Sequence, residues 1–139
     1  MEVNQYSLNE IDDSLLKFAV IVSRYKDQWV YVKHKDRTTW EIPGGRREPF
    51  ESIIETAHRE LIEETGAINY HLKPVSIYGV TRQGESSYGI LCLADIINFK
   101  EDLSHEISEV AYFDRPPSHL TYPEIQPYLQ ASVEKFLME

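Results

Sequence analysis

Residues 44–67 read GGRREPFESIIETAHRELIEETGA, and this stretch decides how the rest of the chain is interpreted. The apolar residues over 52–65 have helical spacing, and Gly66 suits the left-handed conformation that commonly ends a helix. Six of the twenty-four residues are glutamates, and three of them lie within five positions: Glu60, Glu63 and Glu64. This concentration of negative charge marks a candidate functional site.

The helical wheel places these carboxylates beside the apolar face of the predicted helix. At about 100° per residue, Glu64 lies about 40° from Glu60, and Glu63 lies about 60° away on the other side. The apolar residues occupy a sector that overlaps this one and includes Glu64: Ile53, Ile54, Ala57 and Leu61. Carboxylates crowded at a partly buried site raise at least one pKa unless a cation is present. An all-oxygen cluster of this kind suits Mg²⁺ or Mn²⁺.

The alternative is a glutamate-rich surface helix, because a run of charge is usually a solvated face. Glu55 and Arg59, four residues apart, would then form an ion pair. The spacing of the whole segment argues against a simple surface helix. Five residues separate Gly45 from Glu51, and seven more separate Glu51 from the run RELIEETGA over 59–67. This spacing resembles the Nudix box, G-x5-E-x7-R-E-U-x-E-E-x-G-U, where U is a bulky aliphatic residue. Eight of the nine specified positions match, and the ninth, Ala67, is apolar but small.

The resemblance implies a fold, a reaction and a set of site residues. Nudix proteins are α/β/α sandwiches with a mixed β-sheet, and most hydrolyse a nucleoside diphosphate linked to another group, using Mg²⁺ or Mn²⁺ and an attacking water. The implied metal ligands are the carbonyl of Gly44 and three carboxylates: Glu60, Glu63 and Glu64. Glu60 is also a candidate to orient or deprotonate the water. Arg59 would pair with Glu51, which would hold a further metal ion or water.

Residues outside the box complete the expected site. Some members take an additional base or ligand from a later loop, and Glu106 is the first candidate here, with Glu109 second. Lys33, or failing it Arg37, precedes the box where members often place a phosphate-contacting residue. Two aromatic residues are candidates to stack on a nucleobase, although strand and helix-flanking aromatics are more often core residues: Trp40 and Tyr122.

The pattern along the chain agrees with an α/β fold in one domain over 1–139. A buried strand is expected at 15–23, and 28–34, which alternates more, should be its hairpin partner after a Lys26-Asp27 turn. A short strand at 38–43 should run into a tight turn at the glycine pair. Three further strands are expected at 73–81, 87–98 and 109–114. Apolar residues from Ile125 to Leu137 predict a last helix, with Pro123 and Pro127 obscuring its start.

The composition is that of an ordinary globular protein, with 42% hydrophobic and 27% charged residues in 139. A net charge of −9 argues against a nucleic-acid partner, because binding a polyanion requires a basic face. A small nucleotide remains compatible, since divalent cations reverse the local sign. Cys92, the single cysteine, lies in an apolar run and predicts a buried, inert thiol. The chain shows neither a leader pattern nor a long apolar span, so we expect a cytoplasmic protein without a membrane partner.

The substrate is open among three possibilities. The segment HKDRTTWEIPGGRREPFES resembles mutator-type enzymes, which cleave nucleoside triphosphates, oxidised purine nucleotides among them, to monophosphate and pyrophosphate. The second possibility is another diphosphate: a dinucleoside polyphosphate, a nucleotide sugar or a capped RNA. The third is a nucleotide-binding sensor without turnover, although such domains usually lose the box glutamates that this chain retains. Many Nudix proteins form homodimers, so a homodimer is a further possibility.

Overall fold

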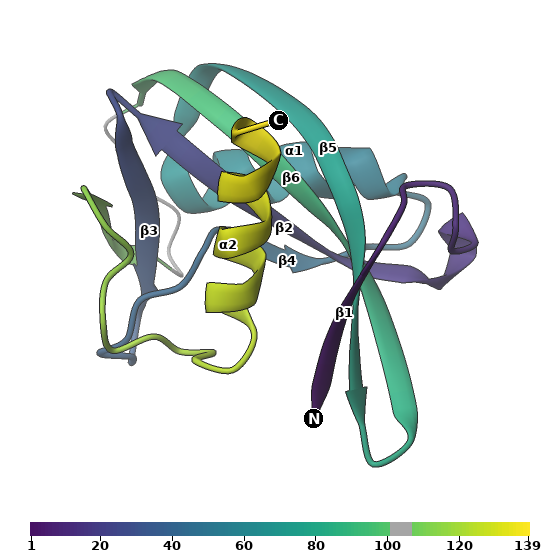
Figure 1. Ribbon diagram of the computed structural model, residues 1–139. Coiled ribbons are helices and arrows are strands. Elements are labelled where there is room, and N and C mark those ends of the chain that lie inside the picture. Colours follow the sequence, from purple (N-terminus) through teal and green to yellow (C-terminus); the bar gives the residue numbers. More distant parts are fainter. Residues whose placement is uncertain (101–106) are drawn as a thin grey trace.

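A mixed β-sheet forms the middle layer of the computed structural model, which describes residues 1–100 and 107–139 (Figure 1). Seven strands lie within these described residues: β1 (Glu2–Tyr6), β2 (Leu16–Tyr25), β3 (Gln28–His34), β4 (Gly44–Arg46), β5 (Ala67–Arg82), β6 (Glu85–Phe99) and β7 (Ile107–Phe113). The strand order is β1-β5-β6-β2-β3-β7, and β4 pairs with β2. The β2–β6 pair is parallel and the other pairs are antiparallel, so the predicted mixed sheet is confirmed.

Two α-helices cover the opposite faces of this sheet, as Figure 1 shows. Residues of β2 point alternately to the two sides, because successive side chains on a strand face opposite ways. Ala19 and Ile21 join the core beneath α1 (Ile53–Thr65), whereas Val20 and Val22 pack in the core beneath α2 (Gln126–Leu137). The expected α/β/α sandwich is therefore confirmed, and Cys92 is buried in the α1-side core.

Local sequence signals explain where the helices begin and end. The hydroxyl of Ser52 accepts from the Glu55 N–H while the Glu55 carboxylate accepts from the Ser52 N–H, which forms a capping box at the start of α1. Gly66 ends α1 with φ of 76°. Pro127 lies in the first turn of α2, where a missing N–H breaks no helical bond. Within the described residues, neither helix has the length and apolar character needed to cross a membrane.

Several predicted elements differ from the observed ones. The strand expected at 38–43 is wrong, because Trp40 and Glu41 form only isolated bridges. The tight turn expected at Gly44-Gly45 is also wrong, since both glycines belong to β4. Strands β5 and β6 extend well beyond 73–81 and 87–98, and β1 and a short 3-10 helix, η1 (Asp13–Leu15), were not predicted. The Lys26-Asp27 turn is confirmed, with φ of 48° and 66°.

The two glycines of β4 allow a close approach of neighbouring atoms instead of a turn. A Cβ at Gly44 would meet the backbone carbonyl oxygen of Ala19 in β2, and a Cβ at Gly45 would meet the carboxylate of Glu60 in α1. Strand β4 thus lies directly between the central strand and the glutamate-bearing face of α1.

This difference predicts unequal costs for adding a methyl group. Gly44→Ala must displace a strand backbone, and we expect a loss of about 1–3 kcal/mol in the free energy of unfolding. Gly45→Ala should cost less, because the added Cβ meets the end of the Glu60 side chain, which can shift by giving up its contact with Arg59, instead of a strand backbone. Urea unfolding of both variants measures the two losses, and equal losses would contradict the packing described here.

Phe50 lies in the loop between β4 and α1 and is fully exposed, with φ of 67°. A left-handed backbone is unfavourable for a residue with a Cβ, at a cost of about 1–2 kcal/mol. The loop thus has a glycine-like conformation around a phenylalanine. The side chain therefore does not pack, and the position is strained.

We expect Phe50→Gly to raise the free energy of unfolding by up to about 1 kcal/mol, because relief of strain exceeds the added chain entropy of glycine. Phe50→Ala is the matched control: it removes the ring but keeps the Cβ, so it should give no comparable gain. If both variants stabilise the protein equally in thermal or urea unfolding, ring exposure rather than backbone strain is the cause.

Candidate active site

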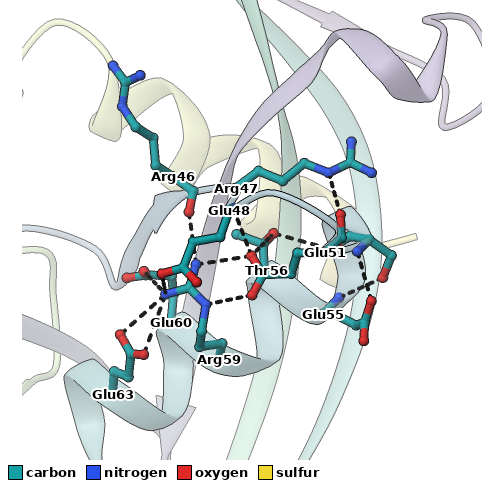
Figure 2. A network of polar contacts seen from close by, with 10 residues as sticks. Arg46, Arg47, Glu48, Glu51, Glu55, Thr56, Arg59, Glu60 and Glu63 are labelled. Carbon is teal, nitrogen blue, oxygen red and sulfur yellow. Dashed lines mark hydrogen bonds and ion pairs between the residues drawn. The ribbon is translucent and has the colours of Figure 1, made fainter.

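The guanidinium of Arg59 lies among four carboxylates on and beside α1 (Figure 2). Its Nε lies 2.6 Å from Glu51 Oε2, and its Nη2 lies 3.1 Å from Glu51 Oε1. Its Nη1 lies 2.6 Å from Glu60 Oε1, 3.3 Å from Glu63 Oε2 and 3.5 Å from Glu48 Oε1. The expected pairing of Arg59 with Glu51 is thus present. Glu55, the partner of Arg59 in the surface-helix alternative, instead caps the helix.

Arg59 also ties the preceding loop to the helix. Its Nη2 donates to the carbonyl oxygen of Arg46 at 2.9 Å, whereas the Arg46 side chain points away from the glutamates in Figure 2. Glu51 accepts further hydrogen bonds from the Thr56 hydroxyl at 2.7 Å and the Glu48 N–H at 3.0 Å. The bond from Arg59 is the main reason that the pKa of Glu51 is lowered to about 2. Glu51 is therefore a firmly ionised anchor.

The three clustered glutamates have different environments. Glu63 has a side chain that is 49% exposed, whereas that of Glu60 is 13% exposed. Burial raises the pKa of Glu60 to about 7, the nearby charge of Glu64 adds to the rise, and Arg59 opposes it. Glu64 is almost completely buried, as the helical wheel predicted, and burial likewise raises its pKa.

The Glu64 carboxylate contacts two residues from different strands. Its Oε1 accepts from the N–H of Gly44 at 2.9 Å, and its Oε2 lies 3.0 Å from His34 Nε2. The second contact is at ion-pair distance for a protonated His34, but it does not count as a hydrogen bond, because His34 Nε2 has no hydrogen-bond partner among the described residues. The contact with Glu64 is the main cause that raises the pKa of His34. His34 and Gly44 together oppose the rise in the pKa of Glu64.

The donor set fits a hard divalent cation, although the described residues contain no preformed group of three or more acidic, histidine or cysteine side chains around one point. Glu60 and Glu63 are turned to Arg59, and Glu64 is turned to Gly44 and His34. Burial and the charge of Glu64 raise the pKa of Glu60 despite the contact with Arg59, so an added cation would stabilise the ionised form of Glu60. Carboxylate oxygens without sulfur ligands suit Mg²⁺ or Mn²⁺.

A cavity of about 480 Å³ adjoins the carboxylates on the α2 side of β4. The two regions share Gly44 and Gly45, which line the cavity and also contact Glu64 and Glu60 respectively. Most of the walls are apolar, and polar side chains surround them: Glu41, Arg82, Glu85, Ser86, Ser87 and Gln126. The size and lining are those of a small-molecule site.

The predicted nucleotide contacts divide between this cavity and other surfaces. Tyr122 lines the cavity. Trp40 packs edge-on against Phe113, and Lys33 lies 4.6 Å from the Trp40 ring and 3.5 Å from Glu109; neither Lys33 nor Trp40 is among the described residues that line the cavity. Glu106 lies outside the described residues.

Three residues at the site were not predicted: His34, Glu41 and Gln126. Gln126 is buried in the cavity wall, and its Oε1 accepts from the N–H of Ile42 at 2.8 Å. The only sequence signals were a histidine at the end of a strand and a polar residue at the start of an apolar helix. Neither signal indicates a partner, because the partners lie 30 and 84 residues away in the chain.

Comparisons with known proteins agree with this geometry. A putative 8-oxo-dGTP diphosphatase, YtkD, of Bacillus subtilis (strain 168) is 31% identical over 106 residues, which cover 76% of this chain and 66% of that one. A second putative 8-oxo-dGTP diphosphatase of the same organism is 51% identical over 47 residues, 34% of this chain and 32% of that one. This chain thus spans less than two thirds of the length of both relatives.

A solved structure and a family model extend the comparison to most of the chain. The structure of a variant of the Bacillus subtilis pyrophosphohydrolase BsRppH superposes with a TM-score of 0.83 at 24% identity, over 98% of this chain and 90% of that one, which shows a shared fold. The family model described as NUDIX domain matches residues 14–126. The box spacing, the sandwich fold and this match agree, and the chain belongs to the NUDIX family.

Proposed function

We propose that this protein, a single domain over residues 1–139, is a pyrophosphohydrolase that cleaves a nucleoside triphosphate to monophosphate and pyrophosphate with Mg²⁺. An oxidised purine nucleotide is the preferred candidate substrate. The observation that carries the proposal is that two features lie next to each other at β4. Gly44 and Gly45 line the cavity beneath α2 and also lie against the carboxylates of α1. A nucleoside in the cavity would place its phosphates near the carboxylates.

Different side chains at the site would have different roles in this reaction. The carbonyl of Gly44 and three carboxylates would hold the cation: Glu60, Glu63 and Glu64. A bound divalent cation neutralises phosphate oxygens and lowers the pKa of a water. Glu60 would orient the attacking water and accept a proton from it, because a cation bound beside this carboxylate would keep it ionised and place the water next to it. Arg59 would keep this carboxylate in place through its 2.6 Å contact.

The cavity supports a small nucleotide as substrate. Its volume of about 480 Å³ is within the range of small-molecule sites, and its apolar walls with a few polar groups suit a base and sugar. Arg46 lies over the ring of Phe18, which lines the cavity beside β4, and this placement makes Arg46 a candidate phosphate contact. The names of the two Bacillus subtilis relatives support 8-oxo-dGTP as the first nucleotide to test.

The test measures pyrophosphate and phosphate release from a panel of nucleotides with Mg²⁺ and with chelator. The panel contains the common and oxidised nucleoside triphosphates, ADP-ribose, NADH and dinucleoside polyphosphates. We expect Mg²⁺-dependent pyrophosphate release from a triphosphate. Turnover of a different diphosphate would correct the substrate, and nucleotide binding with no turnover would favour a sensor. Undiminished turnover in excess chelator would show that the metal mechanism is wrong.

Substitution of the carboxylates tests the site itself. We expect Glu63→Gln and Glu64→Gln to lower turnover by about 100-fold or more, since loss of a ligand should exceed the 10–100-fold typical of residues that act through one. Glu55→Gln is the matched control, a carboxylate of the same helix that serves in the capping box, where glutamine also serves. Normal turnover in the first two variants would refute the assignment.

A further inference from the structure

His34 lies at the end of β3 between two acidic side chains. Its Nε2 is 3.0 Å from Glu64 Oε2 and 3.5 Å from Glu41 Oε2. The Glu64 side chain is 7% exposed and that of Glu41 is 10% exposed, while that of His34 is 24% exposed. The Nε2 atom itself is buried. This arrangement directs the imidazole edge at carboxylate oxygens rather than at solvent.

Glu64 requires a constraint on its side chain if it is to hold a cation in one geometry. Glutamate has three side-chain torsions, and fixing these torsions when a ligand binds costs conformational entropy and so reduces affinity. The N–H of Gly44 fixes Oε1 at 2.9 Å, and His34 faces Oε2. The hydrogen bond comes from β4 and the imidazole contact from β3, so both carboxylate oxygens have a neighbour from a strand.

Glu41 in turn holds His34. Its backbone is fixed opposite β3 by two hydrogen bonds with Val32, each of 2.9 Å. Its Oε2 faces His34, and its Oε1 accepts from Arg37 Nη1 at 3.3 Å. Because Glu41 also lines the cavity, the chain Glu41–His34–Glu64 connects the cavity wall with the carboxylate face of α1.

We propose that His34, held by Glu41, is a positioning residue that sets the orientation in which Glu64 holds a divalent cation. The inference rests on the proposed function in one respect, the role of Glu64 as a cation ligand. His34 acts through Glu64 and does not contact the substrate. Partners that orient a ligand typically change metal affinity by about 10–100-fold.

This role can be tested by measuring the affinity of the nucleotide-free protein for Mn²⁺. Electron paramagnetic resonance or calorimetry gives that affinity directly. His34→Leu removes the donor but fills most of the space, and we expect it to weaken Mn²⁺ binding about 10-fold or more. His34→Gln places an N–H donor near the position of Nε2, and we expect it to restore affinity to within a few-fold of the original. A structural role alone would not produce this rescue.

If His34→Leu fails to fold, a second variant tests the same role through the partner of His34. Glu41→Gln removes the charge that holds His34 and should weaken Mn²⁺ binding several-fold. His34→Leu combined with Glu64→Gln should bind Mn²⁺ no more weakly than Glu64→Gln alone, because His34 acts through that carboxylate. Additive losses, or normal affinity in the His34 and Glu41 variants, would overturn the inference.

The same titrations separate this inference from the proposed function. Weakened binding in Glu64→Gln with normal binding in His34→Leu would refute the positioning role and leave the metal site intact. Normal binding in Glu64→Gln would refute the ligand assignment and the inference that rests on it. Unfolding temperatures in chelator, measured for each variant, distinguish loss of binding from loss of fold.

Discussion

The contact between one guanidinium and several carboxylates is the constraint on which the site depends. Arg59 uses Nε and Nη2 for Glu51 and Nη1 for Glu60, Glu63 and Glu48. The planar fork of arginine allows this division, which a lysine ammonium could not reproduce. Because Glu51 precedes α1 and the Arg46 carbonyl belongs to β4, the same side chain fixes the strand, the loop and the helix relative to one another. The local excess of carboxylate that remains is the physical reason to expect a divalent cation.

The sheet places the carboxylate face of α1 next to the cavity beneath α2. Strand β4 is short and made of Gly44, Gly45 and Arg46, so the α1 carboxylates on one side and the cavity on the other are separated by little more than backbone. A bulkier strand would push Glu60 and the central strand apart, as the contacts of a Cβ at each glycine indicate. The glycine pair therefore matters for closeness of approach, and the positive φ of a turn is not required.

Sequence reasoning succeeded where the deciding contacts are local. Helical spacing over 52–65 and Gly66 predicted the bounds of α1, and helical periodicity predicted that Glu64 would be buried. It failed where pairing is set by distant residues: the 38–43 segment has strand-like composition but only isolated partners, and β1 is polar yet pairs with β5. Glu41 and His34 were missed for the same reason. The contact of His34 with Glu64 exists only because the fold brings the end of β3 next to α1.

The three clustered glutamates show how one residue type acquires three physical states. Glu63 is half exposed and its charge is screened by water, so its geometry is the least constrained. Glu60 is desolvated beside Glu64, and Arg59 offsets only part of that cost. Glu64 is the most buried, and two donors, Gly44 and His34, favour its ionised form. Ionisation of the buried member thus depends on β3 and β4 rather than on α1. The helix supplies the carboxylates, and the strands supply the neighbours of the most buried one.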